Sequence, residues 1–239
     1  MAEREANRAG VPPVGSLTIN DPDTASSRRA AVGEMVCAAL DRAANVGRVD
    51  NDRLDMFYGY DFVTPAECAA LIAMIDADCH PSEVVSDEGY ASERRTSDSG
   101  DLDRFDRLVA EIDARICDVM GLHPRQGETM QGQRYKVGQQ FDLHQDYFSL
   151  KRGIWPDNMR TGGQRTWTAM IYLNAPEAGG NTWFRDAGFA MQPVPGLLIM
   201  WNNMRADGSP NPFALHAGQP VEAGVKYVIT KWFREGYWV

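Results

Sequence analysis

Two histidines and one aspartate have the residue types and the spacing of a metal site. His144 and Asp146 lie two residues apart in a run rich in β-forming residues, and His216 follows much later in the chain. Positions i and i+2 of a strand share a face, so His144 and Asp146 can bind one ion together. Two imidazoles and one carboxylate with open neighbouring positions form the facial triad of non-haem Fe(II) oxygenases. Zinc, manganese or an ordinary surface pair without metal are the alternatives.

A lysine after His216 could neutralise an organic acid at the same place. Lys226 lies ten residues after His216, and the Gly and Pro residues between them predict a turn back toward the metal. If 2-oxoglutarate chelates iron through its keto acid, its far carboxylate needs a fixed cation, because an unpaired buried carboxylate is very costly. Tyr135, nine residues before His144, could donate a hydrogen bond to that carboxylate. A surface lysine that reaches solvent is the alternative.

The segments that must position these residues form a helical part followed by a β-rich part. Hydrophobic spacing and capping signals predict helices over 29–44, 64–78 and 105–120, and polar composition predicts a loop over 88–103. From residue 131 onward, short β-rich runs alternate with Gly- and Pro-rich turns. The expected strands are 133–137, 141–148, 166–173, 182–184, 196–201 and 225–233. This order predicts an α+β fold, a sandwich or jelly roll with N-terminal helices packed on one face.

The chain length fits one domain with a short appendage. Residues 1–28 are rich in Pro, Gly, Ser and Asp without periodicity, and predict a flexible leader. Residues 29–239 then form a single domain, with a helical part over 29–130 and a β core over 131–239.

Composition excludes some partners and favours one compartment. The net charge of −9 argues against nucleic acid, since phosphate binding needs a basic surface. The sequence contains no apolar run of membrane-spanning length, and its N-terminus lacks the apolar region of a secretory signal. The four cysteines are scattered without a CxxC pair, which is typical of idle thiols in a reducing compartment. We therefore expect a cytoplasmic protein with no membrane or nucleic-acid partner.

Motifs over about 100 residues, in order, resemble the catalytic domain of the procollagen-type prolyl 4-hydroxylases. They are Gln133-Arg134-Tyr135-x5-Phe141-x2-His144-x-Asp146-Tyr147-Phe148, Arg165-x2-Thr168-x-Met170-Ile171-Tyr172-Leu173-Asn174, Gly179-Gly180-Asn181-Thr182-x-Phe184 and His216-Ala217-Gly218-x-Pro220-Val221-x4-Lys226-Tyr227-x3-Lys231-Trp232. The resemblance implies a double-stranded β-helix (a cupin-like jelly roll) with iron held by His144, Asp146 and His216. It also implies a 2-oxoglutarate pocket formed by Tyr135, Thr182, Lys226 and Trp232. Oxygen as co-substrate and ascorbate as reductant come with the resemblance.

The same resemblance implies hydroxylation of an unactivated C–H bond, with release of succinate and carbon dioxide. Peptidyl proline is the expected substrate, and the partner is then a peptide or protein. Residues 93–97 resemble the Arg-Thr-Ser loop beside that family's substrate groove, so Arg95, Phe141 and Arg165 are candidate substrate contacts.

At two places near the expected substrate groove, this sequence differs from the usual residues of the family. Phe141 stands where family members usually carry tyrosine, and residues 98–101 lack the aromatic residue that usually follows the loop. Hydroxylation of a free amino acid, another protein side chain or a small metabolite therefore stays open. A metal-binding jelly-roll module without turnover is the alternative from another class.

The segment after the first two candidate ligands has the composition of a lid. Residues 149–164 carry the basic residues Lys151, Arg152 and Arg160 together with three glycines. We expect a mobile lid over the substrate mouth, which would favour an acidic substrate, or else an ordinary surface loop.

Overall fold

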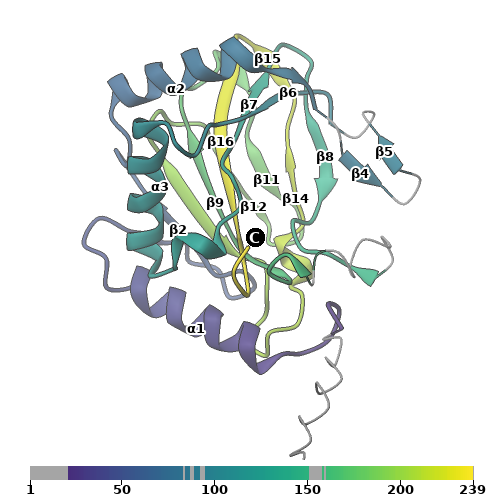
Figure 1. Cartoon of the computed structure of the whole chain (residues 1–239). Coiled ribbons are helices and arrows are strands. Elements are labelled where there is room, and N and C mark those ends of the chain that lie inside the picture. Colours follow the sequence, from purple (N-terminus) through teal and green to yellow (C-terminus); the bar gives the residue numbers. More distant parts are fainter. Residues whose placement is uncertain are drawn as a thin grey trace, which may run out of the picture.

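The computed structural model describes residues 21–82, 84–86, 89–91, 95–150, 158 and 160–238, of which 84–86 and 89–91 are described by their backbone alone. In this part of the chain three α-helices accompany two larger antiparallel sheets and two short strand pairs. The helices lie together on one side of the molecule, and the strands fill the other (Figure 1). The expected α+β fold with helices on one face is confirmed.

The larger sheet has eight strands and forms the wall between the helices and the interior. Its order is β1 (Gly47–Arg48), β2 (Met56–Gly59), β13 (Leu198–Asn202), β9 (Arg165–Tyr172), β16 (Lys226–Arg234), β7 (Gln131–Tyr135), β6 (Asp98–Asp101) and β3 (His80–Pro81).

A four-stranded sheet faces the inner side of the large one. Its order is β12 (Phe189–Met191), β11 (Thr182–Phe184), β14 (His216–Gly218) and β8 (Phe141–His144). The remaining strand pairs are β10 (Ala178–Gly179) with β15 (Val221–Ala223) and β4 (Val84–Ser86) with β5 (Gly89–Ala91). Short 3-10 turns are η1 (Pro124–Gln126) and η3 (Pro212–Ala214).

The central strands of the large sheet are buried on both faces, and alternate residues serve two different cores. On β9, Trp167, Ala169 and Ile171 pack toward the helices, whereas Met170 and Tyr172 belong to the cluster between the sheets. Because successive side chains of a strand lie on opposite faces, one strand can serve both cores. The same alternation on β16 places the side chain of Lys226 on the inner face of the large sheet.

Local signals set the helix ends. The helix α2 (Pro65–Asp78) begins with the predicted capping box of Thr64 and Glu67. The helix α3 (Arg107–Met120) begins after the N-cap Asp106 and ends at Gly121, whose φ of 65° is the left-handed conformation that favours glycine. The prediction that α3 starts at Phe105 is wrong, because that side chain precedes the N-cap and is 88% exposed.

The boundary of the leader also differs from the prediction. The helix α1 is Ser27–Leu40 with Ser26 as N-cap, so it starts and ends earlier than expected. Residues 21–26 already contact the domain, since the main-chain oxygens of Asp21 and Thr24 accept hydrogen bonds from the buried guanidinium of Arg29. Residues 1–20 lie outside the described residues.

The region 88–103 is not simply a loop. Its strand β6 pairs with β3 and β7 at the edge of the large sheet. Ser97 and Ser99 are buried there and hydrogen-bond to the hydroxyl of Ser82. A polar composition concealed this strand because its buried side chains, Asp98 and Ser99, are satisfied by ion pairs and hydrogen bonds and not by apolar packing.

No helix in the described ranges is both long and apolar enough to cross a membrane. The four cysteines are free thiols, with Cys68 and Cys117 buried.

Candidate active site

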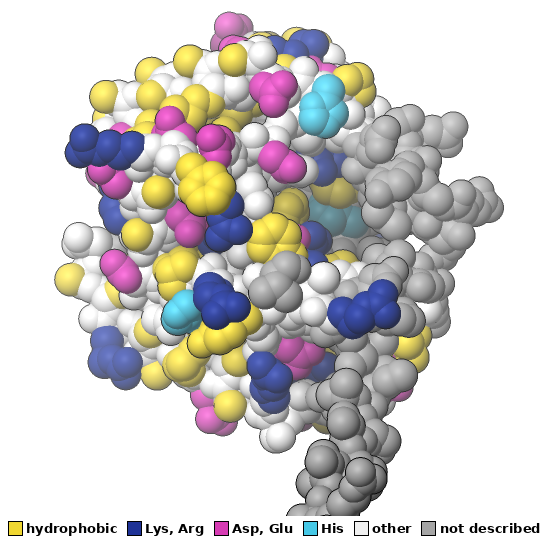
Figure 2. Space-filling model, in the orientation of Figure 1, with side chains coloured by type: hydrophobic (Ala, Val, Ile, Leu, Met, Phe, Trp, Pro, Cys, Tyr) yellow, Lys and Arg dark blue, Asp and Glu magenta, His cyan; other side chains and the backbone are white. Residues whose placement is uncertain are grey.

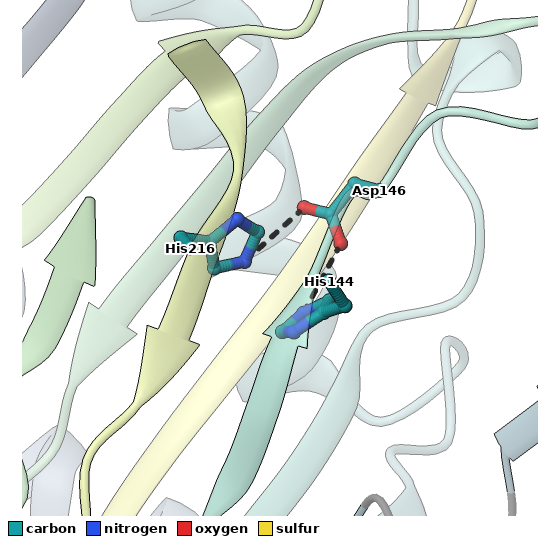
Figure 3. Close-up of side chains that lie close together, drawn as sticks. All are labelled: His144, Asp146 and His216. Atoms are coloured by element: carbon teal, nitrogen blue, oxygen red, sulfur yellow. Dashed lines mark ion pairs between the residues drawn. The ribbon is translucent and has the colours of Figure 1, made fainter. Parts of the chain in front are cut away.

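His144, Asp146 and His216 converge on one point between the two sheets (Figure 3). The Nε2 atom of His144 lies 3.7 Å from Asp146 Oδ1, and that of His216 lies 3.9 Å from Asp146 Oδ2. One ligand atom from each residue can be chosen so that all three lie within 4.8 Å of one another. This is a separation that a single metal ion can bridge.

The two imidazoles come from neighbouring strands of the small sheet. His216 on β14 pairs directly with His144 at the end of β8. In both rings Nδ1 faces a main-chain oxygen, that of Asp142 at 2.8 Å and that of Ala214 at 2.9 Å. When Nδ1 carries the proton and donates it, Nε2 is left with a lone pair for a metal.

The expectation that Asp146 shares a strand with His144 is wrong. The strand β8 ends at His144, and Asp146 lies in the bend that follows. There, the Asp146 carboxylate accepts a 2.7 Å hydrogen bond from Thr168 Oγ1, and Asn203 Nδ2 donates to Thr168 at 2.9 Å. The carboxylate is thus oriented from the large sheet and not by strand alternation.

The electrostatics of the triad favour the protonation states that a metal needs. Burial, together with the adjacent His216, lowers the pKa of His144 to about 3, so this imidazole is neutral. Burial raises the pKa of Asp146, but the two imidazoles, Arg165 and the Thr168 hydroxyl outweigh it and hold the pKa below its ordinary value. Neutral imidazoles and an ionised carboxylate are the metal-binding forms of these groups.

Lys226 lies in the same cavity as the triad. It is only 2% exposed, and its strand neighbour in direct register is Tyr135. Its ammonium lies 5.2 Å from the ring centroid of Tyr135 and 5.4 Å from that of Tyr172. Burial lowers the pKa of Lys226 to about 7. A cation in such a place calls for an anionic ligand.

The other predicted pocket residues line this cavity as well. Thr182 and Trp232 border it together with Tyr135 and Lys226. The indole N–H of Trp232 is buried without a hydrogen-bond partner among the described residues. Figure 2 shows a hollow on the face of the molecule, with histidine and basic side chains at its floor. The donors and the cation present therefore fit Fe(II) and a dicarboxylic keto acid.

Sequence reasoning missed three residues that support the site. Thr168 orients the iron-binding carboxylate, Tyr172 donates a 2.6 Å hydrogen bond to Thr182, and Trp201 packs edge-on against His216 with the ring centroids 5.0 Å apart. All three side chains face the interior from β9 or β13. Their alternation with the helix-facing residues of the same strands was the available signal.

The three candidate substrate contacts are held by other protein groups. Arg165 makes a bidentate ion pair with Glu128, at 2.6 and 2.7 Å, and stacks on Trp232. Arg95 is buried and hydrogen-bonded to serine and glutamine side chains, and Phe141 lies between Arg95 and His144.

The middle of the predicted lid, residues 151–157 and 159, lies outside the described residues. Its two ends are fixed to the domain. The buried Gln164 side chain bonds both the N–H and the C=O of Phe148, and Asp23 accepts hydrogen bonds from Ser149 and from the N–H of Leu150. The segment therefore starts and ends beside the iron site.

We expect Thr168→Val to weaken Fe(II) binding by about 10- to 100-fold, the usual effect of removing a hydrogen bond to a metal ligand. Anaerobic titration with Fe(II) measures it. Thr166→Val is the matched control, because Thr166 is buried on the same strand but its hydroxyl donates to the main-chain oxygen of Phe233 and not to Asp146. Equal affinities of the Thr168 and Thr166 variants would contradict the assigned role of Thr168.

Comparisons with known proteins agree with this geometry. A family model described as the 2OG-Fe(II) oxygenase superfamily matches residues 130–234. The chain is 35% identical over 201 residues to probable prolyl 4-hydroxylase 8 of Arabidopsis thaliana, a match covering 74% of this chain and 67% of that relative.

Solved structures show the same fold. The viral collagen prolyl hydroxylase of Paramecium Bursaria Chlorella virus-1 matches with a TM-score of 0.60 and 24% identity, covering 75% of this chain and 95% of that one. A prolyl hydroxylase from Trichoplax adhaerens, in complex with a hypoxia inducible factor peptide fragment, matches with a TM-score of 0.55 and 15% identity over 87% and 91% of the chains. The double-stranded β-helix expected from the motifs is thereby confirmed. With the assembled triad and the identity to a curated relative, the chain belongs to the prolyl 4-hydroxylase family of Fe(II)- and 2-oxoglutarate-dependent dioxygenases.

Proposed function

We propose that this enzyme hydroxylates prolyl residues of a peptide or protein, with Fe(II), 2-oxoglutarate and oxygen, and with ascorbate as reductant. The observation that carries the proposal is the meeting of the triad and Lys226 in one cavity. A binding module without turnover has no need of a buried ammonium beside a metal site. The names of the relatives supply the substrate class.

When bound, Fe(II) and 2-oxoglutarate would activate oxygen, the oxidant, for attack on an unactivated C–H bond. The protein's own residues would hold and orient these groups. His144, Asp146 and His216 would hold the metal and leave room for the keto acid and oxygen. Lys226 and the Tyr135 hydroxyl would receive the distal carboxylate, and the apolar walls of the cavity exclude water.

Arg165 and Glu128 lie behind Trp232, one of the residues that line the cavity. The guanidinium of Arg165 stacks at 4.3 Å on Trp232 and at 5.0 Å on Phe148, so Glu128 fixes a layer of planar groups beside Asp146. The buried Glu128 also binds Arg234. Glu128 is the carboxylate partner of both guanidinium groups, so Arg165 is already engaged by a protein carboxylate and held in a fixed position.

The engaged guanidinium of Arg165 favours a peptide over a free amino acid. A free amino acid carries a carboxylate that needs a cation, but Arg165 is already paired with Glu128. A prolyl residue within a chain brings only neutral amide groups to the site. Hydroxylation of a free amino acid or a small metabolite remains the competing outcome.

Incubation with proline-rich peptides, Fe(II), 2-oxoglutarate and ascorbate tests the proposal, with mass spectrometry of the peptides and an assay of succinate. We expect peptides to gain one oxygen atom on proline, with succinate formed in step. His144→Ala should abolish both products and leave the fold intact. Oxygen gain on free proline but never on peptides would contradict the peptide assignment.

The pKa of Lys226 predicts how 2-oxoglutarate binding depends on pH. In the free enzyme the ammonium loses its proton near pH 7, whereas a bound carboxylate favours the charged form and raises the pKa. Binding above pH 7 therefore requires proton uptake, and the dissociation constant should rise by up to about tenfold per pH unit.

Calorimetric titration with 2-oxoglutarate between pH 7 and 9, in buffers of different ionisation enthalpy, measures both the affinity and the proton uptake. Lys226→Arg is the control, because a guanidinium stays charged throughout this range, so its weaker binding should not vary with pH. A wild-type affinity that is constant from pH 7 to 9 would show that Lys226 does not titrate in the free enzyme.

A further inference from the structure

The two iron-binding imidazoles are enclosed to different degrees. His216 is buried, with Phe184 stacked on it at 5.4 Å and Trp201 against its edge. His144 is partly exposed, since β8 is the outer strand of the small sheet. Its Nδ1 hydrogen bond to the main-chain oxygen of Asp142 fixes one atom of the ring but leaves the ring plane to be fixed by packing. A ligand ring on an outer strand needs another contact to hold its Nε2 toward the metal.

Phe141 provides a contact over the whole face of the His144 ring. The two ring centroids lie 3.6 Å apart with an angle of 13° between the planes. A parallel ring this close leaves the imidazole no room to turn about its Cβ–Cγ bond. The close contact of the two faces also adds dispersion attraction between the rings.

Arg95 lies near the ring of Phe141. Its Cζ atom is 5.0 Å from the ring centroid, and residues 95 and 141 form an antiparallel bridge that brings the two side chains side by side. A guanidinium over an aromatic face is attracted by the negative potential of the ring. Phe141 therefore contacts both the guanidinium and the imidazole.

The guanidinium is itself fixed by a buried polar cluster on β6 and β7. Its Nε donates to Ser97 Oγ at 3.0 Å, and its Nη2 donates to Ser99 Oγ at 2.8 Å and to Gln131 Oε1 at 3.0 Å. Arg95 is 6% exposed. Ser97 and Ser99, which also hydrogen-bond to Ser82, thus hold the guanidinium of Arg95.

We propose that Phe141, held by Arg95, is a positioning residue for the iron ligand His144. The cluster on β6 fixes Arg95, Arg95 fixes Phe141, and Phe141 fixes the plane of the imidazole. Arg95 and Phe141 thus have a function in metal binding in addition to any contact with substrate. This function rests on the iron site of the proposed function but does not depend on the identity of the substrate.

This positioning role requires the aromatic ring of Phe141 and does not require a hydroxyl group. A tyrosine at position 141, as in the resembling family, would keep the stacked ring, whereas leucine would keep the apolar volume without the flat face. Comparison of these two substitutions therefore separates stacking from simple burial.

The test is a titration of the metal-free protein with Co(II), whose visible absorption reports the geometry of its ligands. We expect Phe141→Leu to weaken Co(II) binding by about three- to tenfold, as expected for the loss of one aromatic pair, and to change the absorption bands. Phe141→Tyr should restore the wild-type affinity and spectrum. Thermal unfolding without metal checks that each variant is folded.

Phe62→Leu is the matched control, because Phe62 lies 5.7 Å beneath the guanidinium of Arg115 and packs against the helix-side core. It should leave Co(II) binding and the spectrum unchanged. Arg95→Lys should weaken binding less than Phe141→Leu, and the double variant should bind no more weakly than Phe141→Leu alone, since Arg95 acts through Phe141.

Wild-type Co(II) affinity and spectrum in a folded Phe141→Leu variant would overturn the positioning role while leaving the proposed function intact. Full additivity of the Arg95 and Phe141 effects would overturn the link between them. Failure of the wild-type protein to bind Co(II) would overturn the metal site itself, and the proposed function with it.

Discussion

The structure depends on the electrostatics of a buried cavity that contains charges of both signs. Asp146 and Lys226 are both buried between the sheets, and burial disfavours the charged form of each. The ionised form of Asp146 is stabilised by Arg165 and by the hydrogen bond from Thr168. The ammonium of Lys226 is bordered by the rings of Tyr135 and Tyr172, with no carboxylate hydrogen-bonded to it in the described part of the chain. A ferrous ion and a dicarboxylate together would satisfy both groups, which is why one cavity contains them.

The large sheet makes this arrangement possible because its central strands separate two environments. On β16, Lys226 shares the inner face with Val228 and Trp232, whereas Lys231 lies on the outer face and pairs with Asp113 of α3. An interval of five residues places these two lysines on opposite faces. Lys231 therefore links α3 to the sheet through an ion pair, whereas Lys226 is available for a ligand. The helices stabilise the outer face and leave the inner face to the site.

The meeting of His144, Asp146 and His216, the nearby buried lysine and the fold class could be predicted from the sequence because each rests on residue types in a strict order. The contacts that orient these residues could not be predicted from the sequence. Asp146 lies beyond the end of its strand and is oriented by Thr168, a contact between segments far apart in sequence. The strand β6 escaped detection because Asp98, Ser99 and Gly100, and not apolar residues, fill its buried positions. Arg95 and Phe141 were predicted on the substrate side. The contact of Arg95 with the ring of Phe141, and of that ring with His144, is one that no spacing rule contains.

The most direct measurement of the central claim is anaerobic titration of the protein with Fe(II) and 2-oxoglutarate, followed by visible absorption. The account predicts one Fe(II) per chain and a charge-transfer band on addition of 2-oxoglutarate, with the band lost in His216→Ala. A band of undiminished intensity in folded His216→Ala would contradict the claim that the three side chains form one iron site.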